Sequence, residues 1–117
     1  MSVNMAEVMG RVGRGAQRLD NEQWENKDWR KPIRDAIDKH NLDIGNESTC
    51  VLGHLFGDFS EGTECLALSE EECWQLGFES RFAVSGAYNG DDDERAKVNA
   101  EYSLLNEAWI FLMRYDA

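Results

Sequence analysis

Positive charge is missing from the middle of this 117-residue chain. Between Asn41 and Ser80 there is no lysine or arginine, while the same stretch carries nine of the 23 carboxylates. The formal net charge of −11 therefore arises mainly in the middle of the fold and not in an acidic tail. Direct binding to a nucleic-acid backbone depends on Lys and Arg side chains that displace counterions, so this composition argues against it. A protein partner with a basic surface is favoured instead.

Long hydrophobic runs are also absent. No run of about eighteen consecutive apolar residues occurs, so we expect no transmembrane helix and no contact with a membrane. The segment from Met1 to Gly15 contains arginines but no apolar stretch of signal-peptide length, so we expect no secretory signal. A cytoplasmic location is the resulting expectation.

The cysteines do not suggest a disulfide framework. Cys50, Cys65 and Cys73 are an odd number, and we expect all three to be reduced and largely buried. Cys50 and His54 would share a helical face and could join the other two cysteines and His40 in a zinc site. The chain has no C-x-x-C or H-x-x-x-H pair, however, and single pairs of this spacing are common by chance. We therefore predict no bound metal and no cofactor.

A complete catalytic motif is not present either. Cys50 and His54 on adjacent helical turns leave little room for a substrate between a nucleophile and its base. The glycines near the N-terminus lack the preceding strand and the lysine of a phosphate-binding loop. The acidic run Asp91–Glu94 lacks the glycine and the bidentate glutamate of a calcium loop. We predict that the protein is not an enzyme, and a small zinc-stabilised module or an enzyme is the less favoured alternative.

What the chain does contain is an apolar pattern of helical period. The single proline, Pro32, and the scarcity of β-branched runs favour helices over strands. Apolar stripes predict helices over residues 5–19, 29–40 and 51–59, and Ser69 and Glu72 have the spacing of a capping box at the start of another. The predicted fold is a compact all-α single domain of four or five helices, in which residues 1–20 form either a marginal helix or a flexible arm.

The strongest helical signal is at the C-terminus. Between Asp91 and Tyr115 apolar residues recur at intervals of three and four, and the seam runs through Leu105. We expect this long helix to be the central packing element, covered by the apolar helix Val51–Phe59. Glu101 is predicted to lie on its polar side, where truncation to alanine would change stability by no more than about 0.5 kcal/mol.

Candidate partner-binding residues form two groups. Trp24 and Trp29 are flanked by polar residues and are predicted to be semi-exposed aromatics of the kind that is enriched in interface hot spots. The second group is seven of the nine acids in the segment without lysine and arginine: Glu47, Asp58, Glu61, Glu64, Glu70, Glu71 and Glu79. The commoner roles of such residues are structural: a tryptophan covers the core, and acids form a solvent-exposed face that keeps the protein soluble. The functional roles are complementarity to a basic protein or, alternatively, imitation of duplex phosphates by a DNA-mimic inhibitor of a nucleic-acid-binding protein.

Residues 48–82 resemble a known group of proteins. The segment reads Thr49-Cys50-Val51-Leu52-Gly53-His54, then Gly57, Leu66-Ala67-Leu68-Ser69-x-x-Glu72 and Leu76-Gly77-Phe78. A Cys-x-x-Gly helix followed by a Leu-x-Leu-Ser-x-x-Glu helix is similar to small uncharacterised acidic helical accessory proteins of actinobacterial phages. The resemblance implies a phage-encoded protein in the cytoplasm of a bacterial host, and it brings no catalytic residues. We therefore predict a non-catalytic interaction protein that binds a bacterial host protein and modulates or inhibits it.

Overall fold

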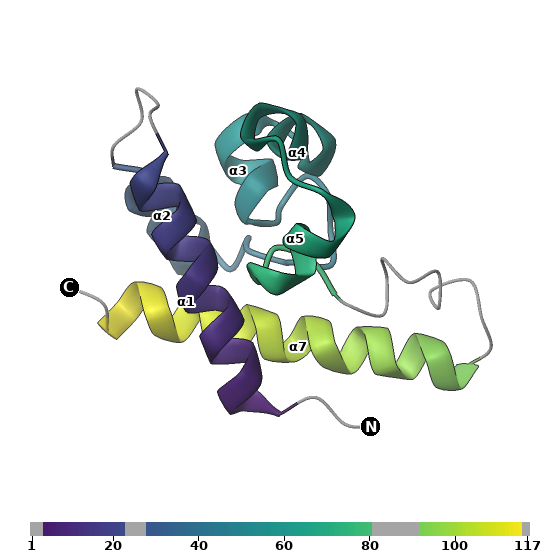
Figure 1. Cartoon of the computed structure of the whole chain (residues 1–117). Helices are drawn as coiled ribbons and strands as arrows, with labels where there is room; N and C mark the ends of the chain where they lie inside the picture. The colour runs from purple at the N-terminus through teal and green to yellow at the C-terminus, as the bar shows by residue number, and fades with distance from the viewer. Residues whose placement is uncertain (1–3, 23–27, 81–91, 116–117) are drawn as a thin grey trace.

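The computed structural model describes residues 4–22, 28–80 and 92–115, and every regular element in them is a helix. This confirms the all-α prediction and the long C-terminal helix. The helices are α1 (Met5–Asn21), α2 (Arg30–Asp38), α3 (Val51–Phe56), α4 (Phe59–Leu66), α5 (Glu70–Gln75) and α7 (Asp92–Tyr115). Figure 1 shows α1 crossing α7, with the short helices α3, α4 and α5 gathered on one side of α7. The described residues thus hold six helices and not four or five.

The helix predicted over residues 51–59 is divided into two short helices. Gly57 ends α3 with a φ of 105°, a backbone conformation that glycine adopts without steric cost. Asp58 is the N-cap of α4, because its side chain accepts a hydrogen bond from the Glu61 backbone N–H at 2.7 Å. The break limits the apolar surface of α3. This helix packs on α2 and α4. The long helix α7 packs mainly on α1 and also on α2. The prediction that the Val51–Phe59 segment covers α7 is therefore wrong.

The N-terminal helix α1 is the main packing partner of α7. Its N-cap is Asn4, whose side-chain oxygen accepts a hydrogen bond from the Glu7 backbone N–H at 2.8 Å. Its buried apolar residues belong to the predicted stripe: Val8, Val12, Ala16 and Leu19. In the structure α1 is thus a packed helix of the core. Neither α7 nor any other helix of the described residues is long and apolar enough to cross a membrane.

Gly15 allows α1 to approach the end of α5 closely. A Cβ at Gly15 would lie 1.9 Å from the Leu76 carbonyl oxygen, whereas a Cβ at Gly13 would have no heavy atom within 4 Å. We expect Gly15→Ala to lower the free energy of unfolding by about 1–3 kcal/mol through overpacking. Gly13→Ala should instead raise it by up to about 1 kcal/mol, because alanine favours the helix. Urea unfolding of both variants measures the difference, and equal effects would contradict the close contact.

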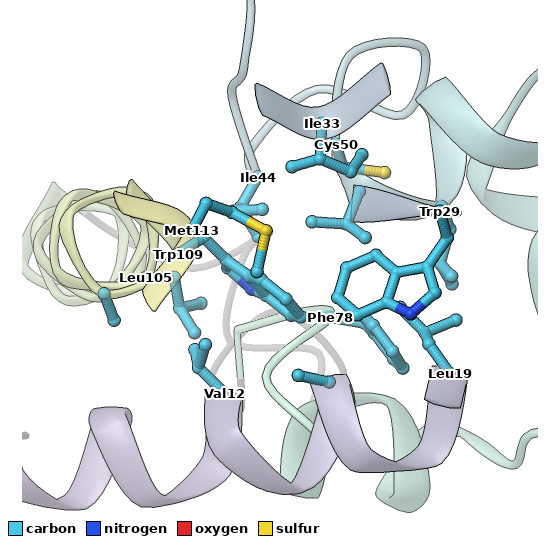
Figure 2. Packing of buried hydrophobic residues seen from close by; sticks show 14 of the residues in the cluster. Val12, Leu19, Trp29, Ile33, Ile44, Cys50, Phe78, Leu105, Trp109 and Met113 are labelled. Atoms are coloured by element: carbon cyan, nitrogen blue, oxygen red, sulfur yellow. The ribbon is translucent and has the colours of Figure 1, made fainter. Parts of the chain in front are cut away.

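Aromatic side chains from three parts of the chain form the centre of the core. The Trp109 ring stacks on Phe78 with centroids 5.8 Å apart, and Trp29 meets Trp109 edge to face at 6.4 Å. Figure 2 shows these rings together with Leu105 and Met113 of α7. The Trp109 ring N–H donates a hydrogen bond to the Gly77 carbonyl oxygen at 2.8 Å, so its one polar atom is satisfied. The predicted seam of α7 through Leu105 and Trp109 is confirmed as buried.

The predicted capping box of α5 is also present. The Ser69 hydroxyl accepts a hydrogen bond from the Glu72 backbone N–H at 3.1 Å, and the Glu72 carboxylate accepts one from the Ser69 N–H at 3.0 Å. The bonds from Ser69 lower the pKa of the Glu72 carboxyl. Gly77 follows with a φ of 75° and turns the chain so that Phe78 enters the core.

Candidate functional site

An ion pair lies inside the core. Arg11 of α1 and Glu101 of α7 are each 1% exposed, and Arg11 Nη2 donates a hydrogen bond to Glu101 Oε1 at 2.6 Å. The same guanidinium donates to the Trp74 carbonyl oxygen at 2.7 Å and to the Glu79 carbonyl oxygen at 3.2 Å. It therefore connects α1, α7 and the chain at and after α5. The prediction that Glu101 lies on the polar side of its helix is wrong, because a buried carboxylate is tolerated where a cation pairs with it.

Glu79 belongs to the same polar cluster and is half-buried. Its Oε1 accepts hydrogen bonds from the Tyr102 hydroxyl at 2.5 Å and from the Ser80 backbone N–H at 2.7 Å. Burial raises the pKa of the Glu79 carboxyl, and the two hydrogen bonds offset this only in part. Glu79 thus holds the chain after α5 against α7, and its carboxylate is engaged within the fold instead of standing free at the surface.

The stability of the protein should carry a pH dependence from Glu79. Because the pKa of this carboxyl is higher in the folded than in the unfolded state, its contribution is full below about pH 4.5 and is lost as pH rises through the folded-state pKa. Glu79→Gln keeps an oxygen that can accept the Tyr102 bond and carries no charge. The variant should therefore gain stability over the wild type as pH rises. Urea unfolding at acidic and neutral pH measures this, and a pH-independent difference would contradict it.

The histidines and cysteines do not converge on a metal site. Within residues 4–22, 28–80 and 92–115, no three His, Cys, Asp or Glu side chains are arranged to hold a metal ion. His54 Nε2 lies 2.7 Å from the Asn41 carbonyl oxygen. The Cys50 sulfur is the N-cap of α3 and accepts a hydrogen bond from the Gly53 N–H at 3.2 Å. Both members of the Cys50–His54 pair thus have local structural roles.

Two of the three thiols are buried. Cys50 and Cys73 match the prediction of burial, but Cys65 is exposed on α4, and that part of the prediction is wrong. Burial raises the pKa of the Cys50 thiol to about 11 and that of the Cys73 thiol to about 12. A thiol with so high a pKa is protonated at neutral pH and is a poor nucleophile.

Trp29 is a core residue. It is 0% exposed, and its ring N–H donates a hydrogen bond to Asp20 Oδ1 at 2.9 Å. The Arg30 guanidinium lies over the ring, 4.5 Å from its centroid, and also pairs with Asp20. The prediction of a semi-exposed Trp29 is wrong, because the neighbouring polar side chains cover the indole instead of leaving it to solvent. Trp24 lies outside the described residues.

The other predicted partner-binding residues are exposed carboxylates of residues 41–80. Glu61 and Glu64 lie one turn apart on α4, Glu70 and Glu71 open α5, and Glu47 lies in the loop before α3. We call these five residues the acidic surface. All five are exposed, and in the described part of the chain none of them forms an ion pair. Their charge is therefore not neutralised by the described residues, whereas Asp58 is only partly exposed and caps α4.

Two polar hollows flank Gly45. One, of about 510 Å³, is lined by residues 44–48, Cys50, Phe59 and Glu79, and the other, of about 360 Å³, lies against the Tyr102 face of α7. The ionisable groups at the first are the exposed Glu47, the protonated Cys50 thiol and the already bonded Glu79. Among the described residues these groups do not pair a nucleophile with a base.

No family model, no curated protein and no solved structure matches this chain. The resemblance of residues 48–82 to phage accessory proteins therefore stays a prediction. Its motif residues have structural roles here: Cys50 caps α3, and Ser69 and Glu72 form the capping box of α5. The shared pattern describes the local fold and not a site.

Proposed function

We propose that this protein is a non-catalytic interaction protein that binds a basic protein of a bacterial host, in the host cytoplasm, and modulates or inhibits it. The observation that carries the proposal is the acidic surface, whose carboxylates have no ion-pair partner among the described residues. Charges of one sign that the described residues do not compensate attract and orient a partner of opposite potential. The partner's lysine and arginine side chains would supply the cations that the middle segment lacks.

The remaining ionisable groups favour binding over catalysis. Arg11, Glu101 and Glu79 are engaged in one polar cluster that holds helices together. The Cys50 and Cys73 thiols have raised pKa values, which suit packing better than nucleophilic attack. These groups therefore support recognition by the charges of the acidic surface better than catalysis.

Affinity capture from a bacterial host lysate tests the proposal. The bait would be the wild type, a triple variant of the acidic surface (Glu61→Gln, Glu64→Gln, Glu70→Gln) and a control that loses the same charge from other exposed acids (Asp35→Asn, Asp38→Asn, Asp93→Asn). We expect one protein in near-stoichiometric amount with the wild type and the control, and a clear loss with the triple variant. The proposal would be contradicted if the triple variant and the control variant recovered equal amounts of the partner, or if the wild type recovered no stoichiometric partner.

A DNA mimic is the second candidate function, and the same uncompensated carboxylates support it. A protein that replaces a polyanion must compete with duplex DNA for its target, and its binding must weaken steeply with salt. Adding duplex DNA to the captured complex at increasing salt separates the candidates. Displacement by DNA favours the mimic, whereas a complex that persists in excess DNA favours binding at another surface of the partner.

A further inference from the structure

An apolar groove and two exposed aromatic rings lie next to each other among the described residues. Met5, Met9, Glu107 and Phe111 line a groove of about 300 Å³ between the start of α1 and the C-terminal half of α7. Phe111 is 54% exposed and Tyr115 73% exposed, and no other large hydrophobic side chain in the described part of the chain is more than half exposed. Their ring centroids are 4.7 Å apart. Phe111 thus lines the groove and also contacts Tyr115, so exposed apolar surface extends from the groove along α7.

We propose that this groove is a docking site for a basic amphipathic helix of the partner protein. The proposal rests on the proposed function, because it gives the same basic partner an apolar anchor. Methionine side chains are flexible and polarisable, so Met5 and Met9 can adapt to the apolar residues that a helix presents along one face. The Glu107 carboxylate at the groove favours lysine or arginine beside those apolar residues. The net charge of −11 attracts a basic helix to the protein as a whole.

Charge argues against a second copy of this chain as the occupant. In a twofold contact the same patch faces itself, so Glu107 of one copy would approach Glu107 of the other. Each copy also carries a net charge of −11, and this repulsion opposes association. A groove of about 300 Å³ lined by four residues accommodates side chains from one helical face. A stable dimer needs a broader contact, roughly 1,000 Å² or more of buried surface.

The test uses the full chain with ¹³C-methyl-labelled methionine and a defined probe. The probe is a peptide of about 15 residues containing only leucine and lysine, arranged so that leucine forms one helical face. Addition of the peptide should shift the methyl signals of Met5 and Met9. The Met113 methyl, in a side chain that is 2% exposed in the core, should stay in place and serves as the internal control.

A matched pair of variants separates apolar docking from simple charge attraction. Phe111→Asp and Ser103→Asp each add one negative charge at an exposed position of α7. We expect Phe111→Asp to weaken peptide binding about tenfold or more, the scale on which a buried phenylalanine contributes. Ser103→Asp should bind as the wild type does, or slightly more tightly. Thermal melts close to that of the wild type would show that neither change disturbs the fold.

Several outcomes would overturn the groove proposal. These are equal affinity of the two aspartate variants, unchanged Met5 and Met9 signals, or equal binding of a peptide with glutamate in place of lysine. Concentration-dependent shifts of Met5 and Met9 without peptide would assign the groove to a second copy instead. None of these results depends on the acidic-surface variants in lysate capture, so failure of the groove and failure of the proposed function are distinguishable.

Discussion

Glu101→Ala is expected to lower the free energy of unfolding by about 3–5 kcal/mol, the cost of removing one partner from a buried ion pair. The change leaves the Arg11 guanidinium, which is 1% exposed, without the carboxylate that it contacts at 2.6 Å. Glu107→Ala, at an exposed position of the same helix, should stay within about 0.5 kcal/mol. Urea unfolding followed by circular dichroism measures both variants. Similar losses for the two would show that Glu101 is not buried.

Replacing both charges tests whether the loss comes from the unpaired cation. A double variant with Arg11→Met and Glu101→Leu buries no charge and keeps apolar volume between α1 and α7. It should be more stable than Glu101→Ala, because apolar pairs often replace buried ion pairs without loss. A double variant less stable than the single one would mean that the hydrogen bonds of Arg11 to the Trp74 and Glu79 carbonyl oxygens matter more than the charge pair.

Leu105→Ala is expected to lower the free energy of unfolding by about 2–5 kcal/mol through the cavity it leaves. Leu105 is fully buried in the core cluster, whereas its neighbour Leu104 is only partly buried. Leu104→Ala, the same chemical change one position away, should therefore cost clearly less. Against a total stability of roughly 5–15 kcal/mol, the loss at Leu105 is large enough to reduce the folded fraction on heating. Thermal melts that rank the two variants the other way would mean that α7 is rotated from its position here.

Periodicity and capping rules predict much of this fold from local residues. The stripe of α1 and the seam of α7 are buried as their spacing indicates, and the box formed by Ser69 and Glu72 is present. Local rules did not identify Gly57 as a helix end, because a glycine within an apolar pattern is compatible with a continuous helix. The packing order was also not predictable, since which helix covers α7 depends on tertiary contacts that periodicity does not encode.

The sequence positions of Arg11 and Glu101 are compatible both with a buried ion pair and with exposed charges. Arg11 directly precedes Val12 in the stripe of α1, and Glu101 lies between Val98 and Leu105 in the seam of α7. Opposite charges that interrupt two apolar stripes indicate a buried pair if the two helices pack together. That condition is met only in the folded chain, where α1 and α7 cross.

The exposure of a candidate binding residue was predictable only where no residue distant in the sequence contacts its side chain. Glu61, Glu64 and Glu70 are exposed, as expected for acids without nearby cations in the sequence. Glu79 is held by Tyr102, which lies 23 residues away in the chain, and a long-range contact of this kind leaves no local pattern. The groove beside Phe111 was not predicted for the same reason, because Met5 and Met9 lie at the other end of the chain and meet α7 only in the folded protein.

Zero-length carbodiimide cross-linking of the captured complex tests most directly whether the acidic surface meets a basic partner. The reagent joins a carboxylate to a lysine amine without a spacer, and residues 41–80 contain no lysine, so every cross-link from this segment must start at one of its carboxylates. We predict cross-links from Glu61, Glu64 and Glu70 to lysines of the partner. Cross-links that start only at carboxylates outside residues 41–80, such as Asp35 or Asp93, would contradict the account.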